Sequence, residues 1–168
     1  MPHPPGSHPP LSLHEKLYAP LKIHAVLRTL SELGVDAGLL LAGSGLFLSE
    51  ASNAHTRSSV HQFIAVCRNA ARLSPEPGWG ALVGASMRLT DYGMYGYALG
   101  CAETMGDSCD LAVRYHGLAT PVMRIGLIAD QDVAAWTFPT LAQSALPDVA
   151  NDLFNSLLEM QVGTHVSL

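Results

Sequence analysis

The sequence predicts an α/β domain of the α+β type, mostly helical, with a small antiparallel β-hairpin packed on the helices. Apolar residues recur at a spacing near 3.6 through most of the chain, whereas a short stretch after Pro121 alternates with a period of two. Glycines and prolines separate these segments. With 168 residues, the chain has the length of one domain, which buries roughly 70% of the surface of the unfolded chain.

The start of the chain, residues 1–17, is predicted to be a disordered tail. Prolines remove backbone donors and fix φ, so they oppose both regular structure and a compact metal site for the histidines among them. They crowd this segment as Pro2, Pro4, Pro5, Pro9 and Pro10. Residues 18–163 are expected to form the folded domain, and residues 164–168 are expected to begin a linker.

The first half of the chain is predicted to fold into helices. The first of them covers residues 20–33, because Ile23, Val26 and Leu30 recur at helical spacing. Gly34 suits its C-terminal cap. Further helices are expected over residues 37–41, 46–49, 60–71 and 79–87. The last of these carries small residues that permit another backbone to approach closely: Gly80, Ala81, Gly84 and Ala85.

Two helices joined at Thr104 are predicted between residues 91 and 118. Thr104 is a good N-cap, and the carboxylate of Asp107 favours the first turn of the second helix. A β-hairpin is predicted after these helices, with one face of each strand packed on them. The inward sets are Met123, Ile125 and Leu127 on one strand, and Ala134, Trp136 and Phe138 on the other.

A final helix is predicted over residues 147–161, and it has a wide apolar stripe. Leu153, Leu157 and Met160 lie along this stripe together with Val149. An apolar stripe of this width can serve a second subunit or another domain. These residues are therefore the predicted dimer or partner surface.

The composition excludes several classes of function. The formal charge is −5, and the absence of clustered lysine and arginine argues against a surface that binds nucleic acid. No apolar run approaches the ~18 residues of a membrane-spanning helix, and the residues at the start of the sequence are not expected to act as a signal peptide. Three dispersed cysteines fit reduced thiols, so a cytoplasmic protein is expected. No catalytic motif or metal-ligand spacing occurs, so no enzyme activity, metal or cofactor is predicted.

Three motifs in the second half of the chain occur together in one known family. They are Gly93-x-x-Gly96-Tyr97-Ala98-Leu99, Thr104-Met105-Gly106-Asp107 and Arg114-Tyr115-His116. Over about residues 20–160, the chain resembles the arabinose-binding-type N-terminal domain of AraC-family transcription regulators of the ornithine-utilisation type. The resemblance implies a domain that binds a small-molecule effector and forms a homodimer. It also implies that DNA is bound only by a C-terminal helix-turn-helix domain, which is absent from these residues.

Arg114 is the first candidate ligand-binding residue, because a guanidinium can hold a carboxylate through two parallel hydrogen bonds. Asp110, four residues earlier, would equally suit an ordinary helical ion pair with it. Arg124 on the hairpin is a second candidate, although the outward face of a strand also explains it. Aromatic side chains that could either line an effector pocket or pack in the core are Tyr95, Tyr97, Tyr115 and Trp136.

Other functions stay open on the sequence alone. A helical domain with a small sheet and several histidines is compatible with a haem- or gas-sensing module, although His116 has no second ligand at a recognised spacing. A pure oligomerisation domain without an effector is another alternative. A small-molecule enzyme is the third, because residues distant in sequence can converge in space.

Overall fold

The computed structural model describes residues 12–53, 55–120, 122–130, 133–139 and 151–167. The helices are α1 (Leu21–Glu32), α2 (Ala37–Leu41), α3 (Leu48–Ala51), α4 (Val60–Leu73), α5 (Trp79–Ser86), the 3-10 helix η1 (Leu89–Tyr92), α6 (Gly93–Gly100), α7 (Met105–Ala119) and α9 (Asn151–Ser167). The strands are β1 (Gly126–Ala129) and β2 (Ala134–Thr137). The predicted fold class, mostly helical with a small antiparallel sheet, is confirmed.

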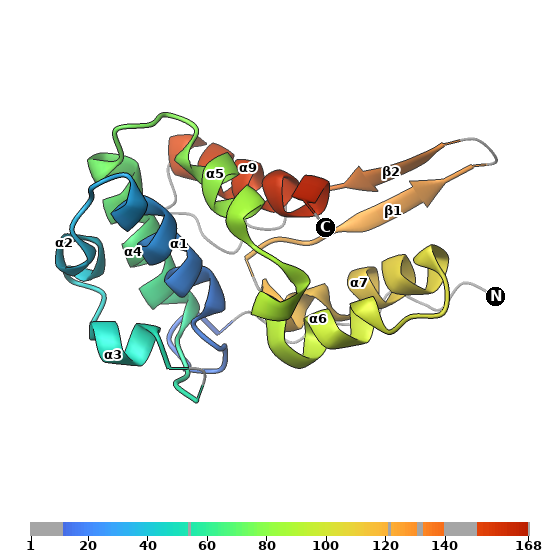
Figure 1. Ribbon diagram of the computed structural model, residues 1–168, viewed down its shortest axis with the longest axis horizontal. Helices are drawn as coiled ribbons and strands as arrows, with labels where there is room; N and C mark the ends of the chain where they lie inside the picture. Colours follow the sequence, from blue (N-terminus) through green and yellow to red (C-terminus); the bar gives the residue numbers. More distant parts are fainter. Residues whose placement is uncertain (1–11, 54, 121, 131–132, 140–150, 168) are drawn as a thin grey trace.

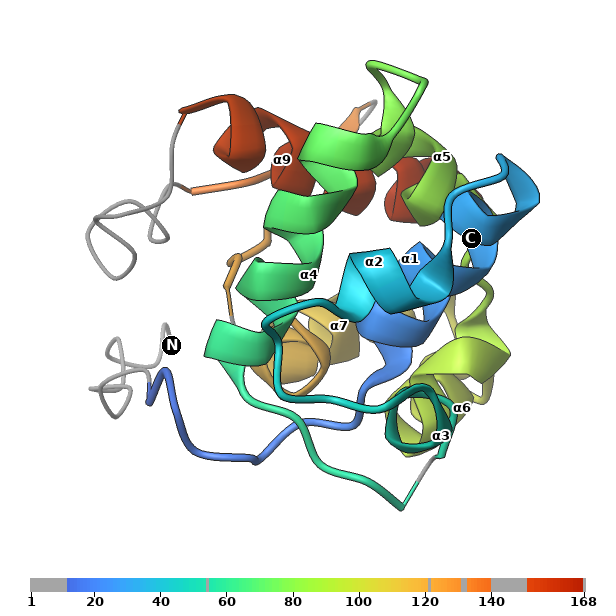
Figure 2. The same ribbon diagram turned by 90° about the vertical axis from the view of Figure 1, so that its left-hand side faces the viewer.

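Helix α1 lies at the centre of the helical part. It contacts α2, α3, α4 and α5, while α9 packs along α5 (Figures 1 and 2). The hairpin and the α6–α7 pair extend together from the other end of the molecule (Figure 1). A large apolar core joins α1, α4, α5 and α9, and a smaller cluster of Leu99, Ala112 and Ile125 sits between the α6–α7 pair and the hairpin.

Local capping chemistry explains where several helices begin. The side chain of Asp36 accepts a hydrogen bond from the backbone N–H of Leu39 at 3.0 Å. Thr104 accepts from the N–H of Asp107 at 3.1 Å, so the predicted junction between α6 and α7 is confirmed. Gly34 ends α1 with φ of +85°, a conformation that favours glycine.

The predicted hairpin is also confirmed. Strands β1 and β2 pair antiparallel, with Leu127 opposite Trp136. The ladder begins at Gly126, later than the alternating pattern suggested. Met123 and Ile125 precede the ladder and are buried in the two apolar clusters as expected, but Val122, which the alternation places outward, is buried as well. Ala134, predicted to face the helices, is exposed because only the second half of β2 approaches them.

Helices α5 and α9 touch through their backbones. A Cβ atom on Gly80 would overlap the carbonyl oxygen of Ser156, and one on Gly84 would overlap that of Met160. From the other side, a Cβ on Gly163 would lie 2.7 Å from the carbonyl oxygen of Ala81. The small residues predicted to permit a close approach do so here.

Helix α9 departs from the expectation at its C-terminal end. The sequence suggested that the folded segment stops at Gly163, yet α9 continues to Ser167 and Thr164 is buried. Gly163 does not end the helix because it meets α5. The predicted start of this helix, residues 147–150, lies outside the described residues.

The apolar stripe of α9 is used inside the chain. Leu153, Leu157 and Met160, the residues proposed for a partner surface, are 5%, 3% and 1% exposed. They belong to the large core, on which α5 and α4 pack. A second subunit therefore cannot reach these three side chains in the folded chain.

Candidate functional site

Two of the predicted ligand-binding residues lie together. Tyr95 on α6 and Trp136 on β2 are half-buried and pack against the smaller apolar cluster. The Tyr95 hydroxyl donates a hydrogen bond to the carbonyl oxygen of Ala112 at 3.3 Å. Trp136 packs edge-on to the ring of His165, with 4.8 Å between the ring centroids. Both side chains are thus held by contacts within the chain.

The other four predicted ligand-binding residues face outward. Tyr97 and Tyr115 are exposed on α6 and α7, and Arg114 and Arg124 are exposed as well. None of these four lines either of the two cavities described next. Their role in ligand binding remains a prediction.

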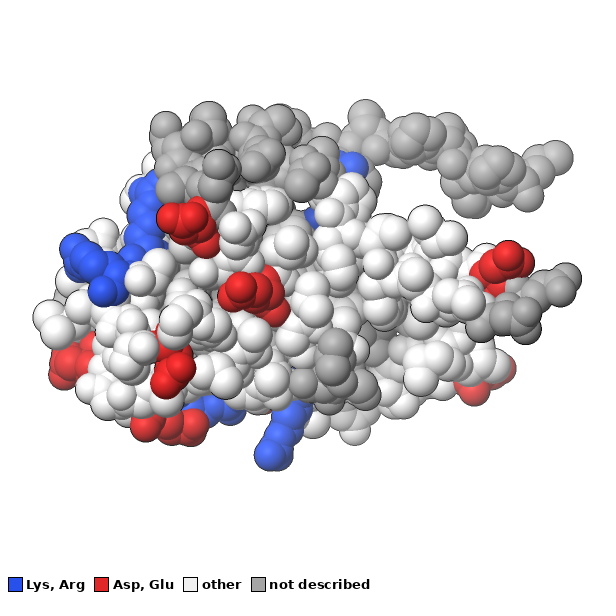
Figure 3. Space-filling view, turned by 90° about the horizontal axis from the view of Figure 1, so that it is seen from above, with Lys and Arg blue, Asp and Glu red and all other residues white. Residues whose placement is uncertain are grey.

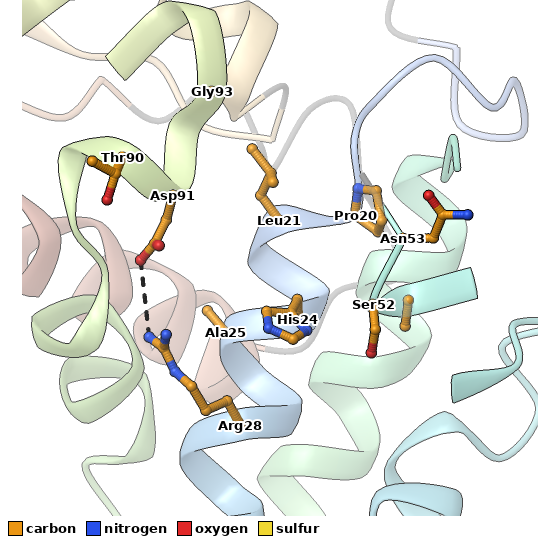
Figure 4. A pocket seen from close by; sticks show the side chains of 11 residues that line it. Pro20, Leu21, His24, Ala25, Arg28, Ser52, Asn53, Thr90, Asp91 and Gly93 are labelled. Carbon is orange, nitrogen blue, oxygen red and sulfur yellow. Dashed lines mark ion pairs between the residues drawn. The ribbon is translucent and has the colours of Figure 1, made fainter. Parts of the chain in front are cut away.

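An outer pocket lies between α1, α3 and η1, and we call it the α1 pocket (Figure 4). Its volume is about 240 Å³, just below the range of small-molecule pockets, roughly 300–1,000 Å³. The residues that line it are Pro20, Leu21, His24, Ala25, Arg28, Ala51, Ser52, Asn53, Thr90, Asp91 and Gly93. Three chain segments distant in sequence therefore meet around one hollow.

One wall of the α1 pocket carries a fixed charged pair. Arg28 donates to the carbonyl oxygen of Ser86 at 2.8 Å and to its hydroxyl at 3.2 Å. The same Nη2 atom lies 3.9 Å from the carboxylate of Asp91 (Figure 4). Asp91 in turn accepts from the backbone N–H of Arg88 at 2.9 Å. Both charged side chains keep about a third of their surface exposed, so solvent or a ligand can reach them.

The rest of the pocket offers mixed chemistry. His24 is exposed on α1 and lies beside Ala25 and Leu21, while Ser52 and Asn53 face it from the end of α3 (Figure 4). Such a surface provides hydrogen-bond donors and acceptors around an apolar base, which suits a small polar molecule. No local pattern in the sequence indicates this pocket, because its parts come from separate segments.

A second group of polar side chains lies inside the molecule, and we call it the Lys22 cluster. Lys22 is 7% exposed, and its ammonium donates to Oε1 of Gln161 at 3.1 Å. Nε2 of Gln161 lies 3.1 Å from Nδ1 of His165. The ring of His116 lies 6.2 Å from that of His165. Among the described residues, no carboxylate pairs with the Lys22 ammonium.

Burial shifts the pKa values of this cluster. Desolvation lowers the pKa of Lys22 to about 7. It also lowers the pKa of His116 to about 3, with smaller contributions from Lys22 and His165. Burial raises the pKa of the neighbouring Cys67 thiol, which therefore stays protonated. His116 is consequently neutral at pH 7, and Lys22 gives up its proton far more readily than an exposed lysine does.

Two atoms near Lys22 have no hydrogen-bond partner among the described residues. They are Nε2 of His116 and Oγ1 of Thr120, both buried on or just after the last turn of α7. Thr120 and Lys22 also line a small inner cavity of about 30 Å³. Lys22 could have been noticed in the sequence, because it precedes Val26 and Leu30 at helical spacing and so falls on the buried face.

The described residues give little support to other site types. No group of three or more His, Cys, Asp or Glu side chains among them could hold a metal ion. None of the described helices is long and apolar enough to span a bilayer. On the face shown in Figure 3, acidic and basic side chains are interspersed among uncharged ones rather than gathered in one basic patch.

Comparison with known proteins agrees with the sequence motifs. A family model described as the arabinose-binding domain of AraC transcription regulator, N-terminal, matches residues 34–168. Two relatives, from Mycobacterium tuberculosis and Mycobacterium bovis, are both named as uncharacterized HTH-type transcriptional regulators. Each is 28% identical over 125 residues, which cover 74% of this chain and 36% of the relative. The chain belongs to the family of arabinose-binding N-terminal domains of AraC transcription regulators.

Proposed function

We propose that this chain is the effector-binding domain of a transcription regulator and that the α1 pocket receives the effector. The observation that carries the proposal is the pocket itself, where Arg28 is held by Ser86 and faces Asp91. A pre-positioned guanidinium loses little side-chain entropy when a ligand binds beside it.

Regulation by this pocket requires a difference in affinity between two arrangements of the protein. A ligand that binds both arrangements equally shifts nothing, however tightly it binds. The location of the α1 pocket supports this part of the proposal, because its walls belong to separate elements, α1, α3 and η1, whose spacing a ligand would fix. In a full-length regulator, the preferred arrangement would control DNA binding by a helix-turn-helix domain of the kind for which the two relatives are named.

Self-association is part of the same proposal. The described residues of α6 and α7 expose large apolar side chains, with Met94 at 85%, Met105 at 80%, Leu118 at 69% and Tyr97 at 68%. An apolar surface of this kind, on a pair of helices with few contacts to the main core, suits a second copy of the chain.

A thermal-melt screen tests effector binding at the α1 pocket. Amino acids, sugars, aromatic acids and fatty acids are each added at saturating concentration, and a ligand at ~100 times its dissociation constant stabilises by about 2.7 kcal/mol. The midpoint then rises by several degrees. Ser52→Trp, which places an indole at the pocket edge, should abolish the shift, whereas Ser49→Trp on the exposed side of α3 should retain it. Equal shifts of the melting midpoint in both variants would indicate that the effector binds at another site. No shift in the wild type would favour a domain that only oligomerises.

A further inference from the structure

We propose that the α1 pocket binds an α-amino acid with a short apolar side chain, whose carboxylate contacts Arg28 and whose ammonium contacts Asp91. This ligand class deepens the proposed function of the same pocket and rests on it. Two observations carry it. Two opposite charges lie close together in one wall, and four apolar residues line the pocket around them, namely Pro20, Leu21, Ala25 and Ala51 (Figure 4).

Arg28 offers unused donors on a guanidinium whose position is already fixed. Its Nη2 atom donates to the carbonyl oxygen of Ser86 at 2.8 Å and to the Ser86 hydroxyl at 3.2 Å. Nε and Nη1 have no hydrogen-bond partner within the described part of the chain. The side chain is 38% exposed, so a carboxylate in the pocket has access to the guanidinium. Neighbouring N–H groups of a guanidinium match the two oxygens of a carboxylate.

Asp91 supplies the complementary acceptor. Its Oδ2 atom accepts a hydrogen bond from the backbone N–H of Arg88 at 2.9 Å, which holds the carboxylate against the start of η1. Oδ1 has no hydrogen-bond partner among the described residues, and the side chain is 32% exposed. The distance of 3.9 Å between Oδ2 and Nη2 of Arg28 is longer than a hydrogen bond. The two groups therefore attract each other but leave donors and acceptors for a ligand.

The spacing of the two charges favours an α-amino acid. Standard bond lengths and angles place the ammonium nitrogen of such a molecule about 3 Å from the nearer carboxylate oxygen. A ligand with this spacing can contact Arg28 and Asp91 at once, because the charged groups of these residues lie 3.9 Å apart. An extended γ- or ε-amino acid holds its two charges farther apart and would contact only one of the two residues.

The balance of charge in this wall favours a zwitterion over a simple acid or amine. A carboxylic acid without an ammonium would place a second negative charge beside Asp91, and an amine without a carboxylate would place a second positive charge beside Arg28. Like charges at such distances repel, although water and salt weaken the repulsion between partly exposed groups. A zwitterion meets each charge of the protein with an opposite one.

The volume and the lining limit the side chain of the ligand. About 240 Å³ corresponds to roughly eight groups of the size of a water molecule, about as many as the non-hydrogen atoms of L-valine. Ala25 and Ala51 are buried residues of the lining, and Leu21 projects from the same helix as Arg28 (Figure 4). Among the described residues that line the pocket, Asp91 is the only carboxylate, so a second ammonium on the ligand would lack a partner.

Isothermal titration calorimetry of the whole chain with L-valine at neutral pH tests the ligand class. The comparison ligands are 3-methylbutanoate, which lacks the ammonium, isobutylamine, which lacks the carboxylate, and L-lysine, which carries a second ammonium. We expect L-valine to bind about tenfold more tightly than any of these three, since each loses a charged hydrogen bond or adds an unpaired charge. An equal affinity for L-valine and 3-methylbutanoate would overturn the assignment of the ligand ammonium to Asp91.

Substitutions at the charged pair should reverse the order of the ligands. Asp91→Asn keeps an acceptor for the N–H of Arg88 but removes the negative charge, so it should bind 3-methylbutanoate more tightly than L-valine. Arg28→Gln keeps an amide donor for Ser86 and should bind isobutylamine more tightly than L-valine. Asp110→Asn removes the same charge from the exposed surface of α7 and should bind L-valine as the wild type does. A purely structural role of the pair would weaken all ligands alike without reversing their order.

The outcomes separate the ligand class from the proposed function. If L-valine does not bind, while another compound shifts the melting midpoint and Ser52→Trp abolishes that shift, the pocket is an effector site and the amino-acid class is wrong. If L-valine binds equally to Ser52→Trp, Asp91→Asn and Asp110→Asn, it binds outside the α1 pocket and both proposals fail for this ligand. If a variant at the charged pair does not fold, the order of the four ligands on the wild type still tests the charge requirement.

Discussion

Replacement of Lys22 by methionine should stabilise the folded chain at mildly acidic pH. The pKa of this buried lysine falls from 10.5 to about 7, which corresponds to about 5 kcal/mol against folding when the unfolded chain is protonated. The variant loses that penalty but leaves Oε1 of Gln161 without its donor, at a cost of about 1–3 kcal/mol. A net gain of about 2–4 kcal/mol is expected at pH 6.

The pH dependence gives the sharper test. Because the pKa of Lys22 is lowered in the folded chain, burial of this lysine costs no stability above pH 10.5. The cost grows as the pH falls and reaches its full value below about pH 7. Between pH 6 and 8.5 the wild type should therefore gain about 2 kcal/mol relative to Lys22→Met. Urea unfolding of both proteins at the two pH values measures this difference, and subtraction removes the contributions of other titrating groups. A constant difference across that range would refute the burial of a titrating ammonium.

Three further outcomes are expected. His116→Phe should make the free energy of unfolding less sensitive to acid. Because burial lowers the pKa of His116 to about 3, the wild type should lose about 2 kcal/mol of stability between pH 7 and pH 5 that the variant keeps, as measured by urea unfolding. An equal loss of stability in both proteins would argue against a buried neutral imidazole. Gly84→Ala should destabilise the folded chain by about 2–3 kcal/mol in the same assay, because the new methyl group would overlap α9. Gly117→Ala, with no atom near its new Cβ, should stabilise the chain by about 0.5–1 kcal/mol. Equal changes in the two variants would contradict the close contact of α5 and α9. Met105→Glu should shift the chain toward the monomer in light scattering at high concentration, with Ser31→Glu as the control, and a wild type that is already monomeric would remove this surface from the proposal.

Local signals in the sequence were sufficient for most elements. The cap at Thr104 and the glycine at the end of α1 act through neighbouring residues, so their effect can be predicted from short segments. The same is true of the period of two in the hairpin. Gly163 misled for the opposite reason, because its role depends on Ala81, which is remote in sequence.

The candidate sites were less accessible to prediction. Residue type alone makes the aromatic and arginine side chains of α6 and α7 candidates for ligand binding, yet their exposure depends on which face of each helix packs against another element. Arg28 and Asp91 are 63 positions apart, and no local pattern indicates that they meet. Lys22 shows what helical periodicity cannot predict. The buried face of a helix is recognised by its apolar residues, so a single buried cation on that face is easily overlooked.

The backbone contact between α5 and α9 has a mechanical consequence. Two helices separated by long side chains can slide past each other when those side chains change rotamer. At Gly80, Gly84 and Gly163 the backbones of α5 and α9 are in direct contact, so no side chain can adjust between them. Helices α5 and α9 should therefore move together as one rigid body during any conformational change. Gly93, between η1 and α6, has φ of +56° and also lines the α1 pocket. We expect a ligand in that pocket to act on the orientation of α6, α7 and the hairpin relative to α5 and α9, rather than on the packing of the core.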